Sequence, residues 1–164
     1  MEINLKMFIP DKIGNKSIKV EKVDNKLIVS AKGTGSPKQL VLNQKLQLNE
    51  FFFKVVGLYF GDGLNSRKYC GNRRVSFANS NYNLHEHWLR FLESFGINKN
   101  QLKCQIGIGA NIDKEFILNY WTAKTKIQKD KFLKINIKQL KSCNEGVLSI
   151  NFDSILFRKI FDNF

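Results

Sequence analysis

Residues 49–63, NEFFFKVVGLYFGDG, decide the fold of this chain, because they read as an apolar helix with glycines where a stable helix avoids them. Gly57 and Gly61 stand four residues apart, and each destabilises a helix interior by roughly 1 kcal/mol relative to alanine. Asp62 stands at the negative end of the helix macrodipole, which disfavours a carboxylate by about 0.3–1 kcal/mol. Three locally unfavourable residues in one short segment predict a functional site there.

The same segment indicates where the helix begins and ends, and what surrounds it. Asn49 is expected to cap its amino terminus and Gly63 its carboxyl terminus. Lys54 is the only charged residue in its interior, and a helix that is apolar on all sides is buried on all sides. One side is therefore expected to cover the chain's own sheet. The other side needs a second helix, whose backbone Gly57 and Gly61 would allow to approach closely.

The charge of the chain favours a nucleic-acid partner. Its 164 residues suffice for one domain, with 43% hydrophobic and 25% charged residues, as in ordinary globular proteins. The formal net charge of +13 favours a polyanion, and nucleic acid is the commonest one. No apolar run has the length of a membrane span and no signal peptide is recognisable, so we expect a cytoplasmic protein without membrane contact. The cysteines form no CxxC pair, which supports neither a zinc site nor a disulfide framework; we expect them to be small buried hydrophobes: Cys70, Cys104 and Cys143.

Strand and helix patterns follow one another along the rest of the chain. Residues 17–33 alternate around Asp24-Asn25 and predict a β-hairpin, so residues 1–48 are expected to form a hairpin arm or a small subdomain. After the opening helix we expect strands at 67–70 and 73–79, joined by a turn at Gly71-Asn72, then a helix from Asn81 or Asn83 to Phe95 and a strand at 102–108. A helix at 113–121, an extended segment at 132–137, a strand at 146–151 and a helix at 153–161 complete the pattern.

This order of elements, opened by VVGLYFGDG at residues 55–63, resembles the LAGLIDADG homing endonuclease family. Gly57, Leu58, Asp62 and Gly63 match the family motif, and Gly61 stands where alanine or glycine is usual. The resemblance covers residues 49–164 and implies an α+β fold with an αββαββα core and an antiparallel, saddle-shaped sheet. Residues 1–48 would be an N-terminal β extension, and residues 110–145 an insertion before the last strand.

The resemblance also implies a dimer and a metal site. In that family two motif helices pack side by side at a twofold axis, and their C-terminal acids meet at the floor of a DNA-binding saddle. A chain with one motif would form a homodimer, with Phe53, Gly57 and Gly61 at the interface. Asp62 would be the catalytic residue and a ligand of Mg²⁺, with the backbone carbonyl of Gly61 as a further ligand and no small-molecule cofactor. The metal would activate water and stabilise the leaving oxygen in cleavage of double-stranded DNA.

The reading face would be the polar face of the sheet, laid along the major groove. In 73–79 the apolar Val75 and Phe77 alternate with polar residues, and in 102–108 the polar Lys103 and Gln105 alternate with apolar ones. Arginine can bond guanine, and asparagine or glutamine adenine, through two hydrogen bonds. The residues expected to bind DNA are Arg67, Lys68, Arg73, Arg74, Ser76, Asn79, Lys103 and Gln105.

Departures from the family leave the reaction open. Phe60 occupies the position of the motif's earlier aspartate, and the chain ends where the family usually supplies a basic residue to the active site. Residues 124–141 hold seven lysines and one acid, and predict either an arm that contacts phosphates or a solvated basic face; Lys124, Lys126 or Lys134 could supply the missing cation. Three functions stay open: a Mg²⁺-dependent endonuclease, a non-cleaving transcription regulator on the same scaffold, and an RNA-binding splicing helper.

Overall fold

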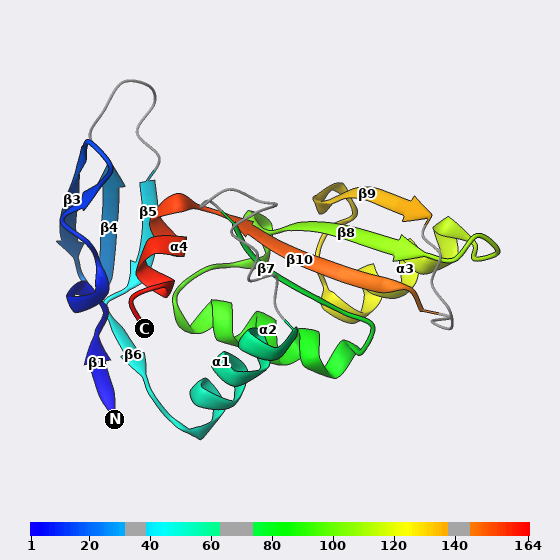
Figure 1. Cartoon of the computed structure of the whole chain (residues 1–164), viewed down its shortest axis with the longest axis horizontal. Helices are drawn as coiled ribbons and strands as arrows, with labels where there is room; N and C mark the ends of the chain where they lie inside the picture. Colours follow the sequence, from blue (N-terminus) through cyan, green and yellow to red (C-terminus); the bar gives the residue numbers. More distant parts are fainter. Residues whose placement is uncertain (32–38, 63–73, 138–144) are drawn as a thin grey trace.

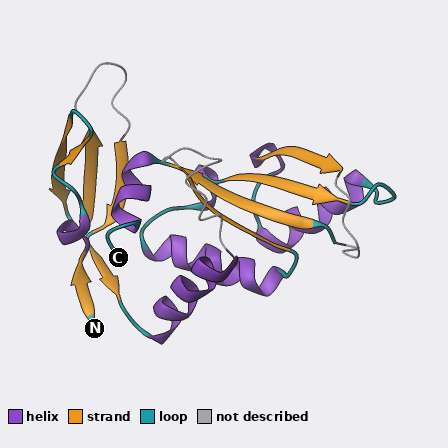
Figure 2. Ribbon diagram, viewed as in Figure 1, coloured by secondary structure: helices purple, strands orange, loops and turns teal. Residues whose placement is uncertain are grey.

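The computed structural model describes residues 1–31, 39–62, 74–137 and 145–164. It has a mixed α+β architecture with two four-stranded sheets (Figures 1 and 2). The main sheet lies in the body of the molecule, and the second sheet, built from the N-terminal residues, stands at one end. In the described part of the chain no helix has the length and apolar character needed to cross a membrane.

The main sheet has the strand order β7-β10-β8-β9. The central strand β10 (Val147–Asp153) pairs antiparallel with β7 (Arg74–Asn79) on one side and with β8 (Lys103–Ile108) on the other. The edge strand β9 (Phe132–Ile137) runs parallel to β8. The expected antiparallel sheet therefore holds for the first three strands. The fourth strand, β9, comes from the expected insertion. A parallel pair needs a long crossover connection, and α3, which lies between β8 and β9 in the sequence, supplies it.

Helices cover one face of this sheet (Figure 2). α1 (Glu50–Asp62) and α2 (Tyr82–Ser94) pack against each other and against β7, α3 (Lys114–Thr125) packs against α2, and α4 (Ile155–Phe161) lies between the two sheets. The expected cap of α1 is confirmed, because Asn49 Oδ1 accepts a hydrogen bond from the Phe52 amide at 2.9 Å.

The other expected elements differ from the structure mainly at their ends. α2 begins after the N-cap Asn81, as expected, and α3 runs four residues beyond the expected 121. α4 begins later than expected because Ser154 Oγ accepts from the Phe157 amide at 3.2 Å and so caps the helix, which leaves Asp153 in β10. The strand at 67–70, its turn at Gly71-Asn72, and Gly63, Cys70 and Cys143 lie outside the described residues.

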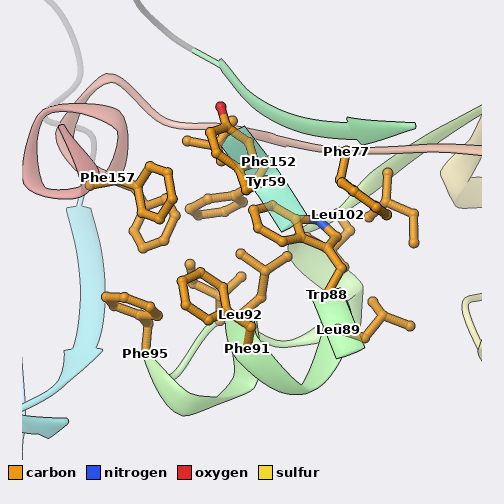
Figure 3. Close-up of a cluster of buried hydrophobic side chains, with 14 of the residues drawn as sticks. Tyr59, Phe77, Trp88, Leu89, Phe91, Leu92, Phe95, Leu102, Phe152 and Phe157 are labelled. Atoms are coloured by element: carbon orange, nitrogen blue, oxygen red, sulfur yellow. The ribbon is translucent and has the colours of Figure 1, made fainter. Parts of the chain in front are cut away.

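The core lies between the main sheet and its helices (Figure 3). Tyr59 of α1 stacks on Trp88 of α2 with ring centroids 5.3 Å apart, and Trp88 stacks in turn on Phe91 at 5.5 Å. Cys104 of β8 is fully buried, which raises its pKa to about 12 and confirms it as a small buried hydrophobe. The sheet residues that complete this core are Val75, Phe77, Ile106, Ile108, Leu148, Ile150 and Phe152.

The N-terminal sheet has the order β2-β3-β4-β5. Its strands are β2 (Lys12–Ile13), β3 (Lys16–Val23), β4 (Lys26–Ala31) and β5 (Gln39–Asn43). The predicted hairpin is confirmed, because β3 and β4 pair antiparallel and the turn between them contains Asp24 at φ 51°. Aspartate is among the few residues that adopt this left-handed conformation readily, so Asp24 is well suited to the turn.

The N-terminal region is a subdomain that shares the core, and it is not a free arm. The Asn43 amide donates to the Phe95 carbonyl at 2.8 Å, and Asn43 Nδ2 donates to the Ser94 carbonyl at 2.8 Å. Gly96 has φ +92°, and a Cβ atom there would stand 3.0 Å from the Asn43 amide nitrogen, so the close approach requires glycine. The remaining short elements are β1 (Glu2–Asn4), which pairs with β6 (Lys45–Gln47), and the 3-10 helices η1 (Leu5–Phe8), η3 (Lys99–Gln101) and η4 (Lys129–Lys131).

His85 is a core residue with a shifted pKa. Its ring lies 5.4 Å from the rings of both Phe77 and Trp121, and Nε2 donates to the Asn79 carbonyl at 2.9 Å. Burial lowers the pKa of the imidazole to about 4, and the hydrogen bond to the Asn79 carbonyl opposes that shift only in part. His85 is therefore neutral in the folded protein at physiological pH.

Acidification is expected to destabilise the fold through His85. The unfolded chain takes up a proton near pH 6.5 and the folded chain only near pH 4. The stabilisation is fully present above pH 6.5 and is lost as the pH falls towards 4, by on the order of 3 kcal/mol. Urea unfolding of His85→Gln between pH 7 and pH 4 should give a flatter profile than wild type. The control His87→Gln, at a less buried position of α2, should keep the wild-type slope. Parallel profiles for His85→Gln and wild type would contradict the assignment.

Candidate nucleic-acid interface

The face of the main sheet that points away from the helices is polar. Residues paired across neighbouring strands share a face, so the register places Arg74 with Asp153, Asn151 with Lys103, and Ser149 with Gln105. On the edge strand Lys134 pairs with Gln105. We call this surface the polar face; its residues are Arg74, Ser76, Lys103, Gln105, Lys134, Asn136, Ser149, Asn151 and Asp153.

Three charged side chains meet at one end of the polar face. Asp153 accepts from Arg74 through both carboxylate oxygens, from Nε at 2.5 Å and from Nη2 at 3.3 Å. Lys103 Nζ lies 3.3 Å from Asp153 Oδ2. Partial burial alone would raise the pKa of the Asp153 carboxyl, but hydrogen bonds and charge from Arg74, and then from Lys103, outweigh it and lower the pKa below its usual value. The cluster therefore carries two cations and one anion at neutral pH.

Ser76 lies on the polar face but is buried. Its hydroxyl donates to Asn151 Oδ1 at 2.6 Å, and the exposed fractions of the two residues are 1% and 3%. The strand alternation predicted the face correctly, because Ser76 pairs with Asn151 across the strands. It did not predict that the hydroxyl bonds within the sheet. Ser76 is therefore a residue that holds two strands together, and we do not include it among the contacts to a ligand.

Asn79 does not belong to the polar face, where it was expected. Strand side chains alternate with a period of two, so Asn79 shares its side of β7 with Val75 and Phe77, and it pairs with Leu148. Its Oδ1 accepts from the Asn81 amide at 2.9 Å, immediately before α2. Asn79 therefore helps to form the turn into the helix.

The structure separates the three lysines of the expected insertion. Lys134 is exposed on β9 and joins the polar face. Lys124 lies in the helical layer, with Nζ 5.5 Å from the centre of the Tyr82 ring of α2. Lys126 is the C-cap of α3 at φ 58°. Because α3 packs against α2, Lys124 and Lys126 lie on the opposite side of the sheet from the polar face, and only Lys134 is in a position to bind there.

Arg158 connects the carboxyl-terminal part of α1 to the start of β7. Arg158 of α4 donates from Nη1 to the Tyr59 hydroxyl at 3.0 Å and to the Arg74 carbonyl at 3.4 Å. This arginine fixes Tyr59 of α1 beside the first residue of β7. Asp62, three residues later, is the last residue of α1. The other candidates from the motif and the first hairpin, Arg67, Lys68 and Arg73, lie outside the described residues.

Sequence reasoning missed Arg158 and Asp153. Counting in steps of two from Ser149 along the predicted strand reaches Asp153 and would have placed it on the polar face, but the strand was expected to end at 151. No local signal identified Arg158, because its contacts with Tyr59 and Arg74 span 99 and 84 residues of sequence.

One side of α1 faces outward in the single chain. Phe52, Val55 and Tyr59 are buried, whereas Phe53 is 58% exposed and Phe60 is 64% exposed. The helix is therefore buried on the side that covers the chain's own sheet, and the single chain leaves uncovered the side that was expected to need a second helix. Cβ atoms added to Gly57 and Gly61 would meet no atom of the described chain within 4 Å. We call Phe53, Gly57, Phe60 and Gly61 the open side of α1.

The end of α1 offers oxygen ligands of the kind that Mg²⁺ takes. The last carbonyls of a helix lack partners within the helix and carry its negative partial charge, which favours a cation. The helix ends with Gly61 and Asp62 in sequence, and Gly61 contributes one of these backbone carbonyls. Among the described residues no three acids, histidines or cysteines lie close enough to share a metal.

Comparison with known proteins gave no relative: no protein-family model, no curated protein and no solved structure matches this chain. Its chemistry is therefore inferred from its own surface. The polar face presents cations and amides. Such groups match the phosphate oxygens and the base edges of nucleic acids.

Proposed function

We propose that this chain is a homodimeric, sequence-specific DNA-binding protein of the LAGLIDADG type that cleaves double-stranded DNA with Mg²⁺. The observation that carries the proposal is the polar face, where Lys103 and Gln105 follow each other along β8 and Lys134 of β9 pairs with Gln105. A twisted sheet of this kind fits the major groove as a β-sheet reader. The net charge of +13 supports the same partner.

The order of elements supports the LAGLIDADG type. α1, β7, α2, β8, β10 and α4 follow one another as the family's αββαββα order requires, apart from the first strand, which is expected at 67–70. α3, η4 and β9 fall within the expected insertion at 110–145.

The open side of α1 supports a homodimer. Gly57 and Gly61 destabilise the helix, and no close contact within the described chain requires them. Phe53 and Phe60 expose large apolar side chains on the same helix. A second copy of α1, packed on this side across a twofold axis, would explain both the two glycines and the exposed phenylalanines. It would also bring the two Asp62 residues together.

In this proposal the site residues have different roles in metal binding, DNA binding and positioning. Asp62 and the Gly61 carbonyl of each chain would hold Mg²⁺, which supplies a hydroxide from bound water and charge stabilisation for the leaving oxygen when present. Lys103 and Lys134 neutralise phosphates, and Gln105 reads a base edge. Arg158 ties α1 to β7 through the Tyr59 hydroxyl and the Arg74 carbonyl, and so fixes the position of the helix against the sheet.

One observation favours a second candidate, a DNA-binding regulator that does not cleave. Phe60 replaces an acid of the motif and is 64% exposed at the end of α1. With phenylalanine in place of the earlier aspartate of the motif, each chain has one acid, Asp62, at this end of the helix. Binding would then use the same polar face, and Asp62 would have no role in the reaction.

Selection from a random duplex library with the purified protein tests the proposal. We expect a defined consensus, binding that weakens steeply with salt, and cleavage of the selected duplex in Mg²⁺. Lys103→Ala and Lys134→Ala should each lower the slope of log affinity against log salt by about 1, because each removes one phosphate contact. The control Lys124→Ala, on the opposite side of the sheet, should leave that slope unchanged.

The outcomes separate the candidates. Binding to the consensus without cleavage in Mg²⁺ or Mn²⁺ favours the regulator. Preference for structured RNA over duplex DNA at equal salt favours the splicing helper. Absence of any enriched duplex would overturn sequence-specific DNA binding altogether.

A further inference from the structure

We propose that Asp153 is a positioning residue that sets DNA sequence specificity, because it holds Arg74 and Lys103 in fixed directions on the polar face. This inference rests on the proposed DNA-binding function and assigns a role that the resemblance does not supply. Asp153 is the last residue of the central strand β10. Arg74 and Lys103 stand on the strands on either side of it.

The geometry makes Asp153 the link between two strands that do not touch each other. Neighbouring strands are about 4.8 Å apart, so β7 and β8 are separated by about twice that distance. The carboxylate spans this gap, with 2.5 Å from Arg74 Nε to Oδ1 and 3.3 Å from Lys103 Nζ to Oδ2. Without it, two like charges on long side chains would repel each other and sample many rotamers.

The contact between Asp153 and Arg74 fixes the orientation of the guanidinium group. Nε and Nη2 donate to the two oxygens of one carboxylate, which fixes the plane of the guanidinium as well as its position. Guanine recognition by arginine also depends on that plane, because O6 and N7 must be met together. A phosphate contact makes no such demand, since it carries no sequence information.

Electrostatics argues against an incidental acid at this place. A carboxylate on a DNA-binding surface repels phosphates, so its removal should strengthen non-specific binding. The presence of Asp153 between two cations is explained if its carboxylate orients the side chains of Arg74 and Lys103. The competing explanations are that Asp153 only stabilises the sheet, or that it only weakens binding by competing with phosphate for Arg74 and Lys103.

The test compares Asp153→Asn with wild type on two probes, the duplex that wild type selects from the random library and a scrambled duplex of the same composition. We expect the ratio of the two affinities to fall about tenfold, which is the loss of one oriented base contact. Affinity for the scrambled duplex should rise or stay equal, because one negative charge is removed. The control Glu86→Gln removes an equal charge from an exposed position of α2 and should leave the ratio unchanged.

A double-mutant cycle distinguishes positioning from simple stabilisation. Arg74→Ala should lower the specificity ratio about as much as Asp153→Asn, and the double variant should lose no more, because both changes remove the same contact. Arg74→Ala also tests the inference if Asp153→Asn unfolds, since thermal melting identifies that case.

Three results would overturn the inference. The first is an unchanged ratio for Asp153→Asn or for Arg74→Ala. The second is tighter binding of both duplexes by the same factor, which would mark Asp153 as a competitor only. The third is the absence of a selected consensus, which also overturns the proposed function, whereas the first two leave that function standing.

Discussion

Asp62→Asn is expected to abolish DNA cleavage while leaving DNA binding within about threefold of wild type. Asparagine keeps the size of the side chain but removes the charge that would hold Mg²⁺ at the end of α1. Loss of a metal ligand at this point removes several kcal/mol of charge stabilisation, which corresponds to a rate lower by about three orders of magnitude. Single-turnover cleavage of the selected duplex measures the rate, and a gel-shift titration in Ca²⁺ measures the affinity.

The matched control is Asp113→Asn. Asp113 is the N-cap of α3, where its Oδ1 accepts from the Glu115 amide at 2.7 Å, and asparagine is an equally good cap. This variant makes the same chemical change in the helical layer and should cleave at the wild-type rate. Cleavage by Asp62→Asn at more than a tenth of the wild-type rate would remove Asp62 from the reaction.

Gly57→Leu is expected to convert the proposed dimer into a monomer that is at least as heat-stable as a single wild-type chain. In one chain the new side chain meets no described atom near its Cβ position, and the helix gains roughly 1 kcal/mol from losing a glycine. In a dimer packed on the open side of α1, two leucines would force the helices apart. Overpacking typically costs about 1–3 kcal/mol at each site, so the dissociation constant should rise about 100-fold or more.

Analytical ultracentrifugation over a concentration series measures that dissociation constant, and thermal melting of dilute samples measures the monomer. Asn119→Leu adds the same side chain at an exposed position of α3 and should leave dimerisation intact. A Gly57→Leu protein that dimerises as tightly as wild type would show that α1 does not form the interface.

Patterns of short range predicted much of the fold. In β8 the alternation of polar Lys103 with buried Cys104 appears in the sequence as it does in the sheet. Asn49 and Asn81 begin their helices because a side-chain oxygen next to a helical pattern caps the free amides. Such signals depend on a few neighbouring residues, and the sequence contains all of them.

Pairings between distant segments could not be predicted in the same way. The parallel addition of β9 to β8 depends on how residues 109–131 return along the sheet, which no periodicity encodes. The burial of Ser76 depends on Asn151, which lies 75 residues away in the sequence. The candidate site shows both cases, because alternation identified Lys103 and Gln105, whereas Asp153 and Arg158 became visible only when the strands and helices were assembled.

The contact between the two ends of the chain bears on how the protein is made. Phe8 stacks on Phe164 with ring centroids 4.2 Å apart, and Asn163 Nδ2 donates to the Phe8 carbonyl across 155 residues of sequence. α4 packs against β4 of the N-terminal sheet. While the ribosome is still synthesising the middle of the chain, the apolar side of that sheet has no α4 to cover it. The N-terminal strands therefore stay partly uncovered until α4 has been made, and this long-range contact is expected to make folding slow.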